Sequence, residues 1–364
     1  MGNFGRKCSK LTFDVTLSDL FRQNPQENRM RTPTKNGKTT NYQGGLFGMN
    51  KVTIIGSGRV GSTIAYSLTC RGLAQEIVII DIAADRAMGE AQDIRQGLSY
   101  DSSCIVYAGN YEDAKGSDIV IITSGIARKP GQSRLELIQT NVGIQKSIIP
   151  QITKYAPDAV YIMVSNPVDI LTYSFCRLSG VPENRVIGSG AIIDTARLRS
   201  RIADYCGLEV GNVHAYMFGE HGDSGFTPWS LARIAGMHVD EYQAAVESEE
   251  NQIFTTKIDI PEIEKYVRES GSKVISRKGA TFYAIASTVC YIVKAVLTGS
   301  NTAMTVSAMM HGEYGIDDVC LSTLNIVGRN GIVGKINSKL TDEEVAKLQH
   351  SADVLKGTIA QVTL

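Results

Sequence analysis

The sequence predicts an α/β protein in which a domain with a parallel β-sheet is followed by an α+β domain. From Met49 to about residue 190, short runs of β-branched residues alternate with helical stretches. Such alternation is typical of parallel strands whose sheet is covered by helices on both faces. After Pro167 the helical stretches become longer, and a late β segment follows them. We therefore expect domains at residues 49–190 and 191–364.

The first domain contains five short apolar runs that predict strands. Each run is bounded by polar or glycine-containing segments, as buried strands commonly are. The expected strands are Lys51–Ile55, Ile77–Ile80, Cys104–Tyr107, Ile119–Ile122 and Val160–Val164. Helical patterns lie between them, from the turn after Ile55 to about Arg71, at Asp85–Gln96 and at Leu135–Tyr155.

The second domain is predicted to be mainly helical, with one β region. Apolar residues recur at helical spacing in four segments, which are Thr195–Cys206, Trp229–Ala235, Ile263–Ser270 and Tyr283–Leu297. A β region is expected within Met304–Val333, and a last helix is expected at about Asp342–Val362.

Residues 1–48 differ from the rest of the chain, and we interpret them as a leader outside the folded domains. They hold eight Lys or Arg against three Asp or Glu, and they show no sustained hydrophobic period. This composition predicts disorder, and Met49 just before the first strand favours an added leader or an upstream start codon. A targeting peptide is the alternative, although Asp14, Asp19 and Glu27 fit poorly with an acid-poor transit sequence.

Composition excludes several classes of function. The chain of 364 residues has 37 basic and 37 acidic residues, so no net charge draws it to nucleic acid or to anionic lipid. No apolar run approaches the roughly 18 residues of a membrane span. The seven cysteines show no Cys-x-x-Cys spacing, which argues against a disulfide framework or a metal site and favours a reducing compartment. We expect a cytoplasmic protein.

A glycine-rich turn indicates a dinucleotide site. Gly56, Gly58 and Gly61 form a Gly-x-Gly-x-x-Gly pattern before the first helix, and Asp81 ends the second strand 20 residues later. Glycines let the backbone approach a pyrophosphate, whose negative charge is favoured at a helix N-terminus. The Asp81 carboxylate can accept hydrogen bonds from both ribose hydroxyls and would repel a 2′-phosphate. These features predict a Rossmann fold that binds NAD rather than NADP.

A short-chain reductase is an alternative within the same fold class. That class carries a catalytic Tyr-x-x-x-Lys pair, and Tyr111 and Lys115 match its spacing. However, the match lies before the fourth strand, and that class uses a wider glycine spacing in its first turn. We therefore interpret the pair as a chance match on a surface helix.

Polar residues downstream supply the parts of a hydride-transfer site for a hydroxy acid. Asn166 follows a parallel strand, so it lies at the carboxyl edge of the sheet, where ligands of α/β folds bind. Asp194 and Arg197 are three residues apart at a helix start and share one face. His221 lies between glycines, away from any apolar stripe. Each residue alone could be a cap, a surface ion pair or a structural histidine, but together they indicate a catalytic site.

A polar loop adds two cations to this set. The loop follows the strand Ile119–Ile122 after a few residues, has Pro-Gly at its middle and carries Arg128 and Arg134. Both arginines could simply be solvated loop charges. In a site for an acidic substrate they would instead contribute binding and catalysis.

The sequence resembles the L-lactate/malate dehydrogenase family over residues 50–364. The segments that carry the resemblance are GSGRVG, RKPGQSRLEL, VSNPVD, GSGAIIDTARLR, NVHAYMFGEHGDS and KGATFYAIA. It implies reversible hydride transfer between NADH and a 2-keto acid, with His221 as proton donor and acceptor and Asp194 accepting its other ring N–H. It also implies that Arg197 binds the substrate carboxylate, Arg134 polarises the carbonyl after loop closure, and Asn166 orients it.

The same resemblance assigns further contact positions. Besides the glycine turn and Asp81, the implied cofactor positions are Val60, Arg86, Tyr111, Gly125, Ile126, Asn166 and Ser189. Thr281 falls at a substrate-pocket position. Arg199 and His214 match positions that bind fructose 1,6-bisphosphate at a subunit interface in bacterial lactate dehydrogenases, with ordinary surface charges as the alternative. The family also implies a homodimer or homotetramer.

Arg128 determines the expected substrate. At this position the family's lactate enzymes usually carry Gln and its malate enzymes carry Arg. The second carboxylate of oxaloacetate, buried without a partner, would cost about 3–5 kcal/mol, and Arg128 would remove that cost. We therefore expect a dehydrogenase that prefers oxaloacetate and malate. The alternative is an L-lactate dehydrogenase activated by fructose 1,6-bisphosphate, because Thr281, the Trp229 segment and VSAMMHGEYGIDD resemble bacterial lactate dehydrogenases more.

A function from another class is an NAD-binding sensor or a structural oligomer without turnover. Such a protein would not need to keep the acid–base pair or the arginines that bind the substrate. His221, Asp194, Arg197 and Arg134 are all present, which favours an enzyme.

Overall fold

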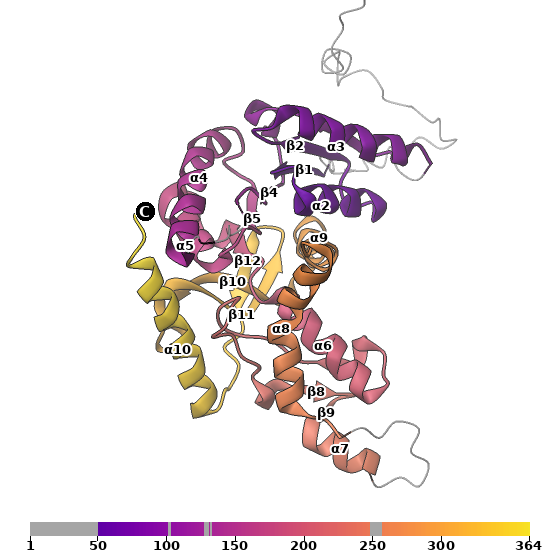
Figure 1. Cartoon of the computed structure of the whole chain (residues 1–364), viewed down its shortest axis with the longest axis vertical. Coiled ribbons are helices and arrows are strands. Elements are labelled where there is room, and N and C mark those ends of the chain that lie inside the picture. Colours follow the sequence, from indigo (N-terminus) through magenta and orange to yellow (C-terminus); the bar gives the residue numbers. More distant parts are fainter. Residues whose placement is uncertain (1–49, 101–102, 127–130, 132, 248–256) are drawn as a thin grey trace, which may run out of the picture. The chain divides into compact units, whose positions relative to one another are not determined.

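Among the described residues, six parallel strands form one part of the main sheet. The structure, a computed structural model, describes residues 50–100, 103–126, 131, 133–247 and 257–364. The strands are β1 (Lys51–Ile55), β2 (Glu76–Ile80), β3 (Ile105–Ala108), β4 (Ile119–Ile122), β5 (Val160–Met163) and β6 (Val186–Gly188). They lie in the order β3-β2-β1-β4-β5-β6, and every neighbouring pair is parallel. Figure 1 shows β2, β1, β4 and β5 following one another in this order. This is the Rossmann strand order, so the predicted fold class of the first part is confirmed.

Three antiparallel strands extend the same sheet. They are β10 (Thr302–His311), β11 (Asp317–Gly328) and β12 (Gly331–Lys335), and they confirm the late β region. The junction is a pairing of Ser307 in β10 with Gly188 in β6. One sheet of nine strands therefore runs through both predicted domains of the described chain. The division at residues 190 and 191 stays a prediction.

Helices cover both faces of the parallel strands. α2 (Arg59–Cys70), α3 (Ala84–Gly97) and α9 (Tyr283–Thr298) pack on one face, and α4 (Arg134–Tyr155) and α5 (Val168–Ser179) pack on the other (Figure 1). Along β4, Ile119 and Ile121 belong to the first core, whereas Val120 and Ile122 belong to the second. All four side chains are buried. Burial on both faces explains why this strand is apolar throughout.

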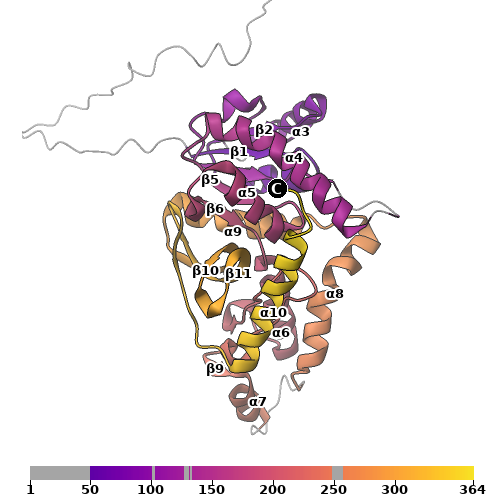
Figure 2. The same ribbon diagram turned by 90° about the vertical axis from the view of Figure 1, so that its left-hand side faces the viewer.

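The remaining helices pack near a small antiparallel sheet and along the outer strands. The small sheet consists of β7 (Val213–His214), β8 (Arg233–Ile234) and β9 (Met237–His238). It shares an apolar core with α6 (Ile192–Cys206) and α8 (Ile260–Lys278), and α7 (Val239–Glu247) follows β9. The last helix, α10 (Asp342–Ile359), packs against β11 (Figure 2).

After Pro167, one predicted element is wrong and one helix was not predicted. The predicted helix Trp229–Ala235 is wrong, because Trp229–Leu231 is a single 3₁₀ turn and Arg233–Ile234 pairs with both β7 and β9. Pairing with strands elsewhere in the chain overrides the local apolar spacing. In addition, Val168–Ser179 forms the helix α5, which was not predicted.

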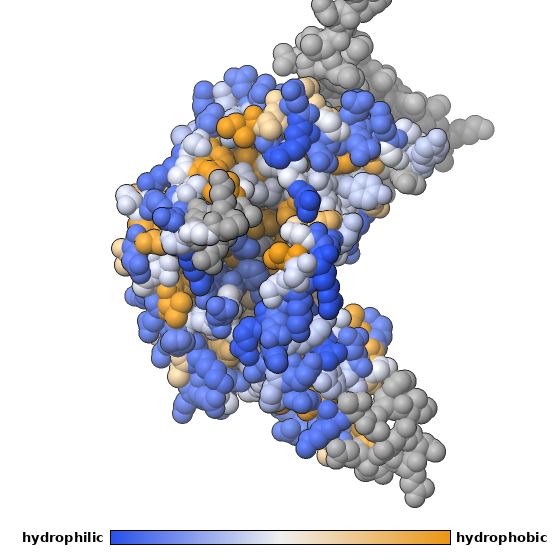
Figure 3. Space-filling model, viewed as in Figure 1, coloured by the Kyte–Doolittle hydropathy of each residue, from blue (hydrophilic) through white to orange (hydrophobic). Residues whose placement is uncertain are grey.

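The face shown in Figure 3 is mostly polar, and its apolar residues form separate patches. The most apolar helix, α9, owes its composition to burial, since Val289, Ile292 and Val293 are fully buried in the core that α9 shares with α2. Within the described part of the chain, every helix is too short or too polar to cross a membrane.

Candidate active site

The glycine-rich turn is closely packed at the start of α2. Gly56 has a φ of 110°, and a Cβ there would lie 2.7 Å from Thr123 Oγ1 and 2.9 Å from Ser124 N. A Cβ on Gly61 would lie 1.9 Å from the carbonyl oxygen of Gly56. Gly58 is the N-cap of α2, so no cap side chain covers the first amide groups of the helix. The turn therefore fits the close backbone approach that a pyrophosphate requires.

Asp81 lies beside this turn at the end of β2. Its Oδ2 accepts hydrogen bonds from the backbone N–H of Ser57 at 2.6 Å, from the Ser57 hydroxyl at 2.9 Å and from Arg86 Nη2 at 2.8 Å. Its Oδ1 accepts the backbone N–H of Ala83 at 2.9 Å. Burial raises the pKa of Asp81, but these hydrogen bonds outweigh burial and lower the pKa to about 2. The carboxylate is thus ionised at neutral pH and would repel a 2′-phosphate.

Asn141 joins the two loops that leave the carboxyl ends of β4 and β5. This buried residue of α4 accepts the backbone N–H of Ile126 at 2.9 Å and donates to the carbonyl oxygen of Asn166 at 2.8 Å. Asn166 lies just after β5, at the sheet edge where the sequence analysis expected it. Asn141 was not among the predicted site residues. A polar residue on the buried face of a helix is the signal that could have found it.

The central feature of the site is Asp194, which lies between His221 and Arg197. Its Oδ2 is 2.5 Å from Nδ1 of His221, and its Oδ1 is 2.8 Å from Nη1 of Arg197. α6 presents Asp194 and Arg197 three residues apart, whereas His221 lies in a loop 27 residues beyond Asp194. The structure thus brings together the three residues that the sequence analysis grouped.

Asp194 and His221 each stabilise the charged form of the other, and Arg197 also stabilises the charged form of Asp194. Burial raises the pKa of Asp194, but His221 and Arg197 outweigh burial, and the pKa lies below its ordinary value. Burial lowers the pKa of His221, but Asp194 outweighs burial, and the pKa lies above its ordinary value. The pair favours an ionised carboxylate and a protonated imidazole. Because Nδ1 faces Asp194, Nε2 is the ring nitrogen available to a substrate.

Arg134 forms an ion pair beside the histidine. It is the first residue of α4, and its Nη2 lies 2.6 Å from Oε1 of Glu220, the residue before His221. Glu220 is buried, and its Oε2 accepts the hydroxyl of Ser224 at 2.6 Å. Its backbone N–H donates to Oγ of Ser351 in α10 at 2.8 Å. Glu220 was not among the predicted site residues, because its partner Arg134 is 86 residues away along the chain.

Family profiles match both parts of the chain. The profile of the lactate/malate dehydrogenase NAD-binding domain matches residues 50–188, and that of the lactate/malate dehydrogenase α/β C-terminal domain matches residues 192–363. The chain belongs to the lactate/malate dehydrogenase family. Residues 50–188 are its NAD-binding domain, and NAD is the cofactor.

Other members of the lactate/malate dehydrogenase family are similar over nearly their whole length. An L-lactate dehydrogenase of Thermoanaerobacterium saccharolyticum is 43% identical over 87% of this chain and 100% of the relative. One of Clostridium perfringens (strain SM101) is 46% identical over 86% of this chain and 98% of the relative. The structure of a minor L-lactate dehydrogenase from Enterococcus mundtii matches with a TM-score of 0.81 at 35% identity, covering 87% of this chain and 99% of that one.

The remaining NAD positions implied by the family resemblance lie in α2, which follows the glycine turn, after β4 and β6, and in a 3₁₀ turn after β3. Val60 lies in α2, and Gly125 and Ile126 follow β4. Ser189 is buried directly after β6. Tyr111 begins a short 3₁₀ turn that ends at Ala114, so the Tyr-x-x-x-Lys match does not lie on an α-helix. The NAD contacts of these five residues stay predictions.

Of the other predicted substrate and effector positions, the structure describes Thr281, Arg199 and His214. Thr281 lies in the segment between α8 and α9. Arg199 donates its Nε–H to the carbonyl oxygen of Ala215 at 3.0 Å, next to the exposed His214. Arg128 lies outside the described residues.

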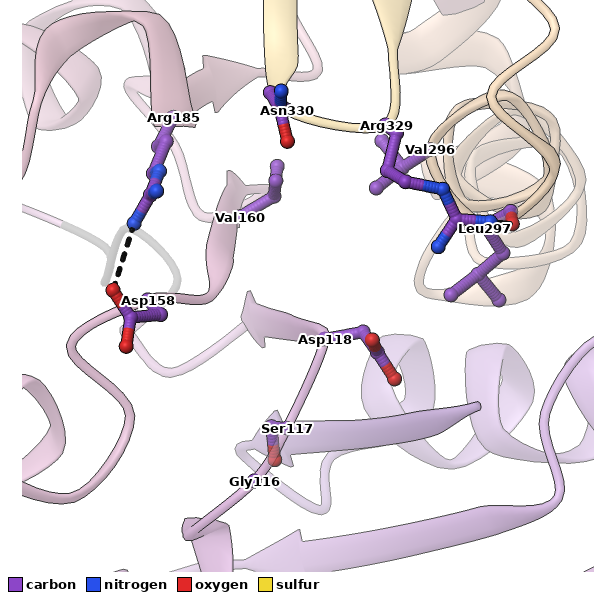
Figure 4. Close-up of a pocket in the computed structure, with 10 residues that line it drawn as sticks. All are labelled: Gly116, Ser117, Asp118, Asp158, Val160, Arg185, Val296, Leu297, Arg329 and Asn330. Atoms are coloured by element: carbon purple, nitrogen blue, oxygen red, sulfur yellow. Dashed lines mark hydrogen bonds and ion pairs between the residues drawn. The ribbon is translucent and has the colours of Figure 1, made fainter. Parts of the chain in front are cut away.

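A cavity of 330 Å³ lies away from this site, at the amino ends of the parallel strands (Figure 4). Its walls come from the segments before β4, β5 and β6, from the end of α9 and from the turn between β11 and β12. Arg185 and Asp158, which form an ion pair at 3.2 Å, line one side of it (Figure 4). None of the predicted site residues lines the cavity, so it is separate from the candidate active site.

Proposed function

We propose that this member of the lactate/malate dehydrogenase family interconverts a 2-keto acid and an L-2-hydroxy acid at the site formed by Asp194, His221 and Arg197. The observation that carries the proposal is that one buried carboxylate contacts both the imidazole and the guanidinium. A 2-keto acid has a carbonyl oxygen that takes up a proton and a carboxylate that requires a cation. Bound NADH supplies the hydride for this reduction.

His221 is the proposed acid and base. In the reduction, its protonated imidazole donates a proton from Nε2 to the carbonyl oxygen, and the Asp194 carboxylate stabilises the imidazolium beforehand. In the oxidation, the neutral imidazole takes up the hydroxyl proton. The pKa of His221 lies above its ordinary value because of Asp194, which favours the protonated imidazole that the reduction requires.

Arg197 is the proposed carboxylate-binding residue. Its side chain is only 16% exposed, and its contact with Asp194 fixes one edge of the guanidinium. A Cβ on Gly271 of α8 would lie 3.5 Å from Nη2, so α8 presents no side chain at this point and leaves room beside the guanidinium. The planar guanidinium can form two parallel hydrogen bonds with a carboxylate, which a lysine cannot do.

Other residues of the chain complete the proposed site. Asn166 would orient the substrate carbonyl. This role is supported by the hydrogen bond from Asn141 that holds the backbone carbonyl of Asn166. Arg134 would polarise the carbonyl, which is supported by its place next to the histidine loop. For NAD, the glycine turn fits the pyrophosphate, and Asp81 fits the ribose hydroxyls.

Pyruvate and L-lactate are the substrate pair that the comparisons support best. The relatives described above are named L-lactate dehydrogenases, and they match nearly the whole of their own length. On this ground we propose that the chain acts on pyruvate and L-lactate.

Oxaloacetate and L-malate are a second candidate pair, favoured by Arg128. A guanidinium at this loop position would pair with the second carboxylate of oxaloacetate. Opposite the methyl group of pyruvate, the same guanidinium would be a charge without a partner in a closed pocket.

Steady-state kinetics with both keto acids distinguish the two pairs. A higher kcat/KM for pyruvate would identify a lactate dehydrogenase, and a higher kcat/KM for oxaloacetate would identify a malate dehydrogenase. We expect Arg128→Gln to raise the ratio of pyruvate to oxaloacetate kcat/KM by about 100-fold, because about 3 kcal/mol of charge pairing is removed for one substrate only.

Two controls complete this experiment. Lys129→Gln removes the neighbouring charge of the same loop and should leave the ratio unchanged. An unchanged ratio in Arg128→Gln would show that Arg128 does not contact the substrate. His221→Gln with most of its activity retained would overturn the proposed reaction itself.

Regulation by a sugar bisphosphate is proposed on the family resemblance of Arg199 and His214. If these residues bind fructose 1,6-bisphosphate, the sugar bisphosphate should lower the KM for the keto acid in the wild type and not in Arg199→Gln. Equal kinetics with and without the sugar bisphosphate would rule out the effector site.

The resemblance to the family as a whole implies a homodimer or a homotetramer. Light scattering of the purified chain would measure the oligomeric state. The cytoplasmic location stays a prediction.

A further inference from the structure

A second carboxylate contacts the histidine, on its backbone. Asp169 lies in the first turn of α5, and its side chain is buried. Its Oδ2 accepts the backbone N–H of His221 at 2.8 Å, and its Oδ1 accepts the hydroxyl of Ser307 at 2.6 Å. Ser307 is the residue of β10 that pairs with β6. Asp169 therefore connects α5, the histidine loop and the junction of the sheet.

Asp169 is a buried carboxylate without a direct ion pair among the described residues, which is an unfavourable place for a negative charge. The ion pairs found among the described residues do not include Asp169, so only hydrogen bonds and more distant charges offset its burial. Burial raises its pKa to about 6, although Ser307 and His221 donate to it. A neutral acceptor such as Asn could satisfy the same N–H at a lower desolvation cost. The carboxylate is thus more than a backbone acceptor.

Charged and titratable groups of the described elements surround this carboxylate and the imidazole. α6 contributes Asp194 and Arg197, the histidine loop contributes Glu220, and β11 contributes Cys320. Glu220 is paired with Arg134, and Asp194 is shared between His221 and Arg197. Asp169 is therefore the carboxylate of this group whose charge no guanidinium in the described part of the chain offsets by direct contact.

The position of Asp169 links two parts of the proposed site. Asn166 lies three residues before it, and the carbonyl oxygen of Asn166 is held by Asn141. One segment therefore carries the residue proposed to orient the substrate carbonyl and the carboxylate that holds the backbone of His221. A displacement of either by about 1 Å would misalign proton donor and carbonyl.

We propose that Asp169 is a positioning residue for the acid–base histidine. It fixes the position of the His221 backbone relative to the turn that carries Asn166, and it adds a second negative charge near the imidazole. This inference rests on the proposed function of His221. It predicts an effect of Asp169 on the keto acid step and on the protonation of His221, and no effect on NADH binding.

The test uses Asp169→Asn in the full chain, because Asn keeps the shape and an acceptor while removing the charge. We expect kcat/KM for pyruvate and oxaloacetate to fall at least about tenfold. The dissociation constant of NADH, measured by fluorescence, should stay unchanged. The rate at which diethyl pyrocarbonate modifies His221 should have its midpoint about half a pH unit lower, because the loss of a nearby negative charge disfavours the imidazolium. His221→Gln serves as the blank for the other four of the five histidines.

A second variant, Ser307→Ala, keeps the charge but removes one of its two donors. It should raise the pKa of Asp169 further and move the acidic limb of the kcat/KM profile to higher pH. If Asp169→Asn does not fold, this profile decides the inference, and an unmoved acidic limb would overturn it.

The possible outcomes separate this inference from the proposed function. A wild type that reduces neither keto acid would refute the proposed function, while the modification of His221 would still report the influence of Asp169. An active wild type whose Asp169→Asn variant has the same kcat/KM and the same modification midpoint would refute the inference alone. A loss of kcat/KM without a shift of the midpoint would also overturn the charge effect that we infer.

Discussion

Asp194 shows how one side chain sets the charges of its neighbours. Both of its oxygens are occupied, one by His221 and one by Arg197, and the residue is buried. The folded pKa of His221 is raised above its unfolded value of about 6.5, so the stability from this pair is fully present below that pH. It is lost as the pH rises through the folded pKa. For Asp194 the pKa is lowered, so its share is present above about pH 4 and is lost as the pH falls.

We expect Asp194→Asn to shift the alkaline limb of keto acid reduction to lower pH. The variant removes the charge that favours the imidazolium, so His221 loses its proton at a lower pH. It also leaves Arg197 partly buried without its anion. We expect kcat/KM to fall by about two orders of magnitude. The pH profile of kcat/KM measures both effects.

A surface pair provides the matched control for this prediction. His311 and Glu183 form the same kind of contact at 2.8 Å, but the His311 side chain is 63% exposed. Glu183→Gln should leave the pH profile of kcat/KM unchanged. An Asp194→Asn profile with its alkaline limb in the wild-type position would mean that Asp194 does not control the protonation of His221.

At the scale of an element, the start of α4 determines where Arg134 lies. Ser133 is the N-cap, and its hydroxyl accepts the backbone N–H of Glu136, whose side chain accepts the N–H of Ser133 in return. This capping box makes Arg134 the first residue of the helix. The local sequence Ser-Arg-Leu-Glu is a signature of such a start.

We expect Ser133→Ala to lower the free energy of unfolding by about 1 kcal/mol and to raise the KM for the keto acid. The loss of stability follows from the uncapped helix, and the rise in KM follows if Arg134 contacts the substrate. Thr341→Ala removes the equivalent capping box of α10. It should cost similar stability without changing the KM. Equal KM values in both variants would mean that the cap does not position Arg134 for the substrate.

At the scale of the whole molecule, the nine-stranded sheet couples the NAD-binding part to the part that carries His221. β6 and β10 meet in one pairing, and Asp169 and Ser307 are hydrogen-bonded next to it. Because strands of both parts belong to the nine-stranded sheet, we expect both parts to unfold in a single transition. A ligand that binds the first part should then stabilise the whole.

We expect NADH at about 100 times its Kd to raise the Tm of the chain by about 5 °C. NADPH at the same concentration should have a smaller effect, because the ionised Asp81 repels its 2′-phosphate. Thermal unfolding with each cofactor measures the difference, and Asp81→Ser should reduce it. Equal shifts with NADH and NADPH in the wild type would contradict the role given to Asp81.

Much of the fold could be predicted because its determinants are local. The strands β1, β2, β4 and β5 are short apolar runs, and the glycine turn is recognisable from its spacing. The segment Trp229–Ala235 could not be predicted, because its pairing partners β7 and β9 override a helical spacing. The three-residue strand β6 is too short to give a pattern of its own.

The sequence by itself determined the residue types of the site: a histidine, two carboxylates, an amide and several arginines in a family order. Only the tertiary structure decided which of them touch. Asp194 lies 27 residues from His221, Glu220 lies 86 residues from Arg134, and Ser307 lies 138 residues from Asp169. The physical reason is that burial and pairing of a charge depend on atoms that the folded chain brings together, whereas strands, turns and caps depend on residues a few positions apart.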